Sequence, residues 1–286
     1  MLSYQQAFYS LCKQLGKIYS DTEAAAIAHE IMEFVTGKGR LQRLVEKDNH
    51  LDERQQSLYD NAIVRLLNGE PLQYITGVQW FFGKPFQVNT SVLIPRPETE
   101  ELVQWVIDEW QDKNDLTILD IGTGSGCIPI SLKLKLPAAS IAAIDVSKSA
   151  LTVALQNAQQ HQAEIFFLEM DFLKEDQWEK LGQFDIIVSN PPYIPEQELD
   201  TLERNVRDFE PEIALFVPDT DALLFYRHIA RFAKEHLSPD GAVYCELHRD
   251  YAQATQAMFE AMSYKATLRK DMHGNDRMLR AERQFL

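Results

Sequence analysis

The second half of the chain alternates short apolar runs with helical segments, and this pattern constrains the fold more than any other feature. Four runs have the continuously apolar character of buried strands, and they cover residues 117–121, 140–144, 165–168 and 185–189. Residues 242–246 and 263–269 are two further strand candidates. Alternation of this kind over about 170 residues predicts an α/β fold built on a doubly wound sheet.

The first part of the chain has the pattern of a small helical bundle instead. Apolar residues recur at helical spacing between Tyr4 and Ile18. Ser20 to Glu23 has the capping-box pattern that opens a second helix, for which Gly37 is a suitable end. Another helix is expected between residues 52 and 69.

A change of character after this bundle divides the chain. Residues 79–92 are rich in aromatic and β-branched side chains, with breaks at Gly83 and Pro85 that predict a hairpin. We therefore expect an N-terminal helical substrate-recognition domain over residues 1–77, a β-hairpin linker over 78–94 and a catalytic domain over 95–286.

The charge of the chain is strongly negative and unevenly distributed. There are 43 acidic and 28 basic residues among 286, a net charge of −15, of which −14 falls after residue 85. Such acidity disfavours non-specific binding to nucleic acid. No apolar run approaches the roughly 20 residues of a membrane helix, and the three cysteines are widely spread, without metal-site spacing. We expect a cytoplasmic, monomeric protein with no metal, no membrane and no direct nucleic-acid partner.

A glycine-rich turn follows the first predicted strand and leads into a helix. The Gly-x-Gly-x-Gly spacing lets the backbone turn sharply and approach a ligand closely. It differs from the Gly-x-Gly-x-x-Gly of dinucleotide oxidoreductases, and no Gly-Lys-Ser/Thr is present to hold phosphate. The candidate cofactor-binding residues here are Asp120, Gly122, Thr123, Gly124, Ser125 and Gly126.

Acidic residues after neighbouring strands extend this site. Asp145, closing the next strand, can accept both hydroxyls of a ribose, while Asp120 can face a positively charged amino-acid portion through water or backbone. Asp171 can bind an adenine amine, and the Phe172 ring can stack on the base. The combination predicts S-adenosyl-L-methionine as the cofactor, with S-adenosyl-L-homocysteine as its product.

The tetrad Asn190-Pro191-Pro192-Tyr193 ends the fourth predicted strand, at the edge where ligands bind in such sheets. The Asn190 amide oxygen and the Pro191 carbonyl can grip the hydrogens of a planar NH2 group, against which Tyr193 can pack. An amide or aryl-amine nitrogen is a weak nucleophile, and two such acceptors align its lone pair with a methyl donor. Neither an ionised base nor a metal is required. These four residues are the candidate catalytic and substrate-binding residues.

Several motifs together make the chain resemble the HemK/PrmC class of protein-(glutamine-N5) methyltransferases. The shared stretches cover residues 69–77, 92–100, 119–126, 188–194, 209–211 and 271–277. The resemblance implies a Rossmann-like class I S-adenosylmethionine-dependent methyltransferase domain, preceded by a helical bundle and a hairpin. It implies that the methyl acceptor is the glutamine of the Gly-Gly-Gln motif in class 1 peptide chain release factors. By the same resemblance, residues 122–126 with Asp145, Phe172 and Asn190 contact the cofactor, and residues 190–193 hold the glutamine.

One departure from the family pattern and three alternatives remain. The family's Leu-Glu-x-Gly reads Cys245-Glu-Leu-His248 here. If that glycine adopts a positive φ, the histidine strains the turn, or the turn differs. An adenine-amine nucleic-acid methyltransferase shares the tetrad, but it should show a basic surface. A ribosomal-protein glutamine methyltransferase and a non-catalytic S-adenosylmethionine-binding scaffold are the others. The stretch 94–100 and the helical N-terminal part favour release factors.

Overall fold

The computed structural model describes residues 1–284, and the described chain falls into two compact units. The first contains residues 1–77 together with the short segment 203–209. The second contains residues 78–202 and the chain from residue 210 onward.

The first unit is helical, and its long helices begin at side-chain caps. Its elements are α1 (Tyr4–Leu15), α2 (Asp21–Thr36), α3 (Arg40–Val45), α4 (Glu53–Leu67), α5 (Leu72–Thr76) and α9 (Arg204–Arg207). Ser3 and Asp52 each form a capping box at the start of α1 and α4, and Ser20 caps α2. The Tyr59 hydroxyl of α4 donates to the Ala7 carbonyl of α1 at 2.7 Å. The three long helices follow the sequence prediction, whereas the short α3 and α5 were not predicted.

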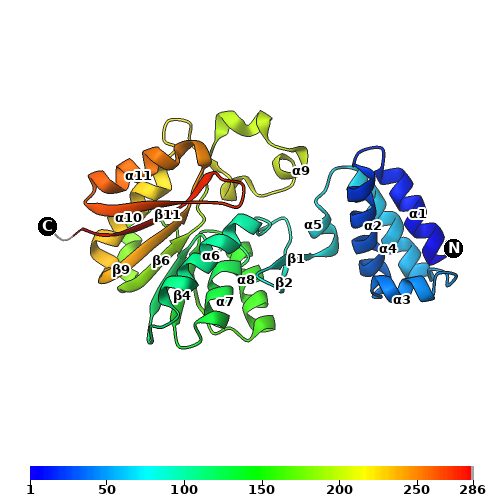
Figure 1. The fold of residues 1–286 in the computed structure, drawn as a ribbon, viewed down its shortest axis with the longest axis horizontal. Coiled ribbons are helices and arrows are strands. Elements are labelled where there is room, and N and C mark those ends of the chain that lie inside the picture. The colour runs from blue at the N-terminus through cyan, green and yellow to red at the C-terminus, as the bar shows by residue number, and fades with distance from the viewer. Residues whose placement is uncertain (285–286) are drawn as a thin grey trace. The chain divides into compact units, whose positions relative to one another are not determined.

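The second unit is built on a seven-stranded sheet (Figure 1). The strand order is β10-β11-β9-β6-β3-β4-β5. The strands are β3 (Thr117–Ile121), β4 (Ser140–Asp145), β5 (Phe166–Glu169), β6 (Phe184–Ser189), β9 (Leu237–Glu246), β10 (Tyr264–Lys270) and β11 (Asp276–Arg283). Two small pairs complete the strands, β1 (Val78–Phe81) with β2 (Lys84–Gln87), and β7 (Ile194–Pro195) with β8 (Phe216–Val217).

Helices cover both faces of this sheet, because alternate residues of each central strand point to opposite sides. On one face Ile118 and Ile186 pack with α6 (Pro97–Trp110), α7 (Cys127–Lys135) and α8 (Lys148–His161). On the other face Leu119 and Ile187 pack with α10 (Leu224–His236) and α11 (Ala252–Ala261). Figure 1 shows this three-layer arrangement, and it confirms the predicted α/β class. Among the described residues, none of the helices is both long and apolar enough to span a bilayer.

At one edge the sheet is antiparallel, and it contains a strand that was not predicted. Strand β11, which was not predicted, lies between β9 and β10 and runs antiparallel to both. Its sequence has only a short apolar pair, Met278-Leu279, and a single Ala281, and all the other residues of the strand are charged. Those charges find partners: the Arg280 guanidinium lies 2.6 Å from the Glu109 carboxylate, and Arg283 donates to the Leu237 carbonyl at 2.6 Å.

Helix α6 begins at Pro97. Proline is tolerated in the first turn of a helix, because the N–H that it lacks would have no intrahelical partner there. Residues 91–96 before it form the end of a turn and a stretch without regular secondary structure, and we call them the strap.

A buried asparagine fastens the β1–β2 hairpin to the rest of the second unit. The fully buried Asn157 of α8 accepts from the Gln87 N–H at 2.7 Å and donates to the Gln87 carbonyl at 3.0 Å. It also donates to the Ser125 carbonyl at 2.9 Å. Ser125 belongs to the glycine-rich turn of residues 122–126, which we call the glycine loop. One side chain therefore joins the hairpin, α8 and the glycine loop.

We expect Asn157→Ala to lower the free energy of unfolding of the second unit by about 3 kcal/mol, because the buried Ser125 carbonyl and two part-buried backbone groups of Gln87 lose their partner. All four tryptophans (Trp80, Trp105, Trp110 and Trp178) lie in this unit. Tryptophan fluorescence during urea unfolding therefore reports on it selectively.

The exposed Gln160, which bonds to the same hairpin at Pro85 and Gln87, provides the control. Gln160→Ala should cost less than about 1 kcal/mol, because water replaces its bonds. Equal effects of the two substitutions would contradict the role given to Asn157.

Candidate active site

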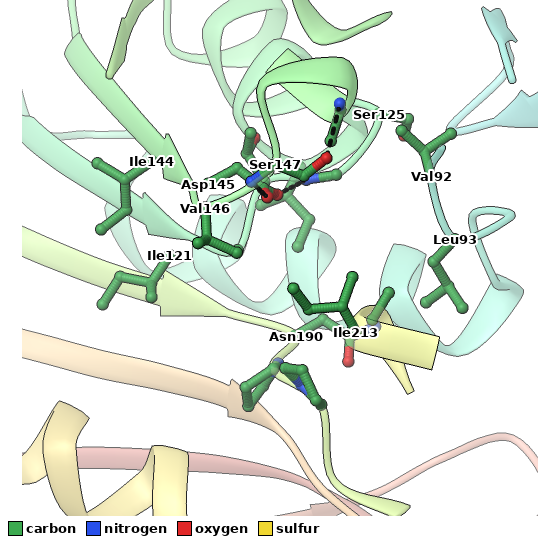
Figure 2. A pocket seen from close by; sticks show the side chains of 18 of the residues that line it. Val92, Leu93, Ile121, Ser125, Ile144, Asp145, Val146, Ser147, Asn190 and Ile213 are labelled. Carbon is green, nitrogen blue, oxygen red and sulfur yellow. Dashed lines mark hydrogen bonds between the residues drawn. The ribbon is translucent and has the colours of Figure 1, made fainter. Parts of the chain in front are cut away.

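A cavity of about 340 Å³ opens at the carboxyl ends of β3, β4 and β6 in the second unit. Its walls come from the glycine loop, the turn after β4, the residues after β5, the tetrad and the strap. Ile213 and Phe225 contribute further apolar surface to the lining. Figure 2 shows Asp145 and Ser147 on the side of the glycine loop, and Asn190 and Ile213 on another side. The cavity lies at the sheet edge predicted from the sequence.

The glycine loop bends through conformations that glycine adopts without strain. Gly122, Gly124 and Gly126 have φ of 75°, 54° and 80°. A Cβ at Gly122 or Gly124 would meet no atom within 4 Å, so these two positions leave room on the cavity side. At Gly126 a Cβ would lie 3.1 Å from Ile130 and 3.2 Å from Ala154, so this glycine allows α7 and α8 to approach each other.

Asp145 holds the glycine loop against the end of β4. One oxygen of its carboxylate accepts from the Gly124 N–H at 2.8 Å, and the other accepts from the Ser147 N–H at 2.8 Å (Figure 2). The Gly122 and Thr123 N–H groups both donate to the Ile144 carbonyl, at 2.9 and 3.0 Å. Burial raises the pKa of the Asp145 carboxyl, and the backbone bonds oppose that shift. Asp145 lines the cavity and has lone pairs left for a ligand.

Asp120 is fully buried beneath the glycine loop and is not part of the cavity wall. Neither of its carboxylate oxygens has a hydrogen-bond partner, and the same holds for the buried hydroxyls of Thr123 and Ser125, which do line the cavity. Burial raises the pKa of Asp120 to about 7; the nearby Thr123 hydroxyl opposes the rise, and the Asp145 charge adds to it. Three unpartnered polar groups in one place are unusual in a folded protein and indicate that a polar ligand completes the site.

Asp171 and Phe172 follow β5, and both line the cavity. The Asp171 carboxylate accepts from the Leu173 N–H and lies 3.2 Å from the Lys174 ammonium. The Phe172 ring is largely buried, edge-on to Phe232 and tilted against Trp178. Its position is therefore fixed by core packing.

The tetrad meets the cavity through three of its four residues. Asn190, Pro191 and Pro192 line the cavity, whereas Tyr193 is part of the neighbouring core cluster. The Asn190 side-chain NH2 donates to the Thr99 hydroxyl at 3.1 Å. The Tyr193 hydroxyl donates to the Glu246 carboxylate at 3.2 Å. Of the other predicted site residues, Asp120 and Gly126 also lie outside the lining.

Sequence reasoning missed three residues that support this site: Thr99, Asn157 and Glu246. Each is almost completely buried, and each uses its side chain to bond another part of the site. Thr99 and Glu246 stand within stretches that were used only for the family resemblance. A buried polar residue on a predicted helix or strand is the available signal, because such a residue needs a partner.

The strap is held over the cavity by a buried carboxylate. Glu210 forms an ion pair with Arg96 and accepts from the Ile94 N–H at 3.1 Å. Its side chain is 1% exposed. Since Arg96 lines the cavity, this pair fixes one of the few cationic groups in the wall.

The histidine that departs from the family pattern causes no backbone strain. His248 has φ of −67° and caps the short helical turn Arg249–Tyr251 by accepting from the Asp250 N–H at 3.2 Å. Because Nδ1 accepts this bond, Nε2 carries the hydrogen and faces Glu198 at 3.2 Å. The turn therefore has an ordinary negative φ, and a histidine is compatible with it.

No group of three or more His, Cys, Asp or Glu within residues 1–284 is arranged to hold a metal ion.

Both parts of the chain match the models of known protein families. The family model of the PrmC N-terminal domain matches residues 6–77, and that of the Methyltransferase small domain matches residues 101–208. A methyltransferase structure from Pyrococcus furiosus shares the fold, with a TM-score of 0.52 and 16% identity over 79% of this chain and 100% of the other.

Two relatives match nearly end to end. A release factor glutamine methyltransferase from Flavobacterium psychrophilum is 44% identical, over 93% of this chain and 94% of its own. One from Bacteroides thetaiotaomicron is 43% identical, over 95% and 97%.

Fold and site together define a class I methyltransferase. Identity over more than nine-tenths of the chain narrows the assignment: the protein belongs to the release factor glutamine methyltransferase family. The resemblance predicted from the sequence motifs is thereby confirmed.

The buried Asp120 should make the unliganded protein less stable as the pH rises. A carboxyl whose pKa is raised on folding favours the folded state below its unfolded pKa, and this contribution is lost as the pH rises through about 7. Asp120→Asn should therefore be more stable than the wild type above pH 7, by up to about 4 kcal/mol. The difference should shrink as the pH falls toward 4.

Thermal unfolding at a series of pH values, followed by tryptophan fluorescence, measures this difference. Asp112→Asn, a substitution in the exposed loop after α6, controls for the loss of one negative charge. A stability difference for Asp120→Asn that is the same at every pH would contradict the prediction.

Proposed function

We propose that this enzyme transfers the methyl group of S-adenosyl-L-methionine to the side-chain nitrogen, N5, of the glutamine in the Gly-Gly-Gln motif of class 1 peptide chain release factors. The observation that carries the proposal is the position of Asn190, which stands in the cavity wall together with the glycine loop and Asp145. The names of the relatives, which span more than nine-tenths of the chain, support the choice of release factor.

The residues on the cofactor side fit S-adenosylmethionine. Gly122 and Gly124 leave space for close approach, and the free lone pairs of Asp145 suit the ribose hydroxyls. The unpartnered hydroxyls of Thr123 and Ser125, which line the cavity, suit the charged amino-acid portion, and the unpartnered Asp120 lies beneath them. Asp171 and Phe172 are at the place proposed for the adenine.

When bound, the cofactor supplies an electrophilic methyl group on a sulfonium. The chain's part is to hold the acceptor nitrogen in line with it. The Asn190 Oδ1 and the Pro191 carbonyl accept the two amide hydrogens, so the lone pair of the nitrogen is directed away from them. Pro191 and Pro192 keep this loop rigid.

The direct test is methyl transfer to purified release factor. Enzyme and labelled cofactor are incubated with a release factor, with the same protein carrying glutamate for the motif glutamine, and with RNA and DNA. Label and the mass of one methyl group are expected on the glutamine-containing peptide alone. Label on nucleic acid alone would favour the adenine-amine activity, and label on neither would remove the proposal.

Asn190→Ala should lower the turnover number by about 100-fold or more, because the amide oxygen acts on the acceptor during the reaction. Cofactor affinity should change much less. Mass spectrometry of the release factor peptide gives the rate, and equilibrium dialysis of the cofactor gives the affinity. Asn114→Ala, in the exposed loop before β3 at the opposite edge of the sheet, is the matched control. Equal losses of rate and affinity would refute the role given to Asn190.

A further inference from the structure

A chain of hydrogen bonds runs behind the tetrad, and its central bond, between Thr99 and Glu246, is buried. The Asn190 Nδ2 donates to the Thr99 Oγ1 at 3.1 Å, and the Thr99 hydroxyl donates to Glu246 Oε2 at 2.6 Å. The Tyr193 hydroxyl donates to the other oxygen of the same carboxylate, Oε1, at 3.2 Å. These hydrogen bonds thus join α6, the tetrad and the end of β9. The side chains of Thr99 and Glu246 are almost fully buried.

The order of donors in this chain determines which way the Asn190 amide faces. A hydroxyl has one hydrogen, and that of Thr99 is directed to the carboxylate. Thr99 can therefore only accept from Asn190, so the atom facing it must be the NH2 group. The carbonyl oxygen of Asn190 is then on the opposite side of the amide, free to accept a hydrogen bond.

We propose that Thr99 and Glu246 are positioning residues for methyl transfer, which present the Asn190 amide oxygen to the acceptor NH2 group and fix Tyr193 beside it. This inference rests on the proposed function for the identity of the acceptor. An amide turned the other way would place two hydrogens against the hydrogens of the acceptor, which is repulsive. One buried carboxylate thus orients two of the four tetrad residues.

Charged and titratable groups surround Glu246 from every side of the site. They are Glu98 on α6, Cys127 on α7, Tyr193 in the tetrad, Tyr226 on α10 and Arg277 on β11. Burial raises the pKa of the Glu246 carboxyl, and Arg277 opposes the rise. A protonated Glu246 can donate to Thr99, which would then donate to the Asn190 oxygen and turn the amide around. The turnover number should therefore fall at acid pH with the titration of Glu246.

The test compares Thr99→Val, which keeps the shape but removes the hydroxyl, with Thr99→Ser, which keeps the hydroxyl. Thr99→Val should lower the turnover number about 30-fold, with cofactor affinity within about twofold of the wild type. Thr99→Ser should recover the rate to within about threefold. Thr255→Val on α11 removes another fully buried hydroxyl bond, to the Tyr251 carbonyl at 2.9 Å, and serves as the matched control with unchanged turnover.

A double substitution separates positioning from a general structural effect. If Thr99 acts through Asn190, adding Thr99→Val to Asn190→Ala should cost less than about twofold. A further 30-fold loss in the double variant, or a wild-type turnover number for Thr99→Val alone, would overturn the inference. Glu246→Gln should remove most of the activity and abolish the fall of the turnover number at acid pH. If the remaining activity of this variant still fell at the same acid pH, Glu246 would have no part in the chain of hydrogen bonds.

A measurement without substrate keeps this inference separate from the proposed function. The side-chain NH2 signal of Asn190 in a ¹H–¹⁵N spectrum is assigned by its loss in Asn190→Ala. It should shift and exchange faster with solvent in Thr99→Val, but remain close to the wild type in Thr99→Ser. An unchanged signal in Thr99→Val refutes the positioning role, whatever the enzyme methylates. Failure of the wild type to methylate release factor refutes only the proposed function.

Discussion

The architecture of the site depends on how a glycine-rich turn with little side-chain packing of its own is held in one conformation. The Asp145 carboxylate binds it from β4 through the Gly124 N–H, and Asn157 binds it from α8 through the Ser125 carbonyl. Asn157 also bonds both backbone groups of Gln87, so the hairpin before the strap shares the same anchor. Backbone groups that would otherwise need water are satisfied by two side chains, and the loop remains open toward the cavity.

The site concentrates carboxyl groups in places where they cost stability. Asp120 is buried without a hydrogen-bond partner, whereas Glu246 is buried but accepts from Thr99 and Tyr193. The two carboxyl groups differ physically. The Asp120 oxygens remain available for hydrogen bonds with a ligand, whereas the Glu246 oxygens already accept the hydrogen bonds that orient their neighbours. Burying these two carboxyl groups lowers the stability of the folded state. The two apolar clusters on the faces of the sheet provide the compensating stabilisation.

Much of this structure could be predicted from residues alone, and the exceptions share a cause. The glycine loop, the tetrad and the central strands have local signals, since turn chemistry and apolar runs are set by neighbours in sequence. Strand β11 has charged residues where a buried strand usually has none, and its partners Glu109 and Tyr244 lie far away in the chain. Thr99 and Glu246 are 147 positions apart, so their bond leaves no local pattern. Long-range pairing of polar groups is what sequence periodicity cannot show.

The position of β11 between β9 and β10 has a consequence for the order in which the sheet assembles. Strands β10 and β11 are consecutive and pair along their whole length, so they can associate early as a local hairpin. The central strands must first close much longer loops, since Ile118 pairs beside Ile186. The last strand therefore need not insert into a finished sheet. In that order of assembly, a preformed hairpin would add its β11 side to the edge of β9 in one docking step.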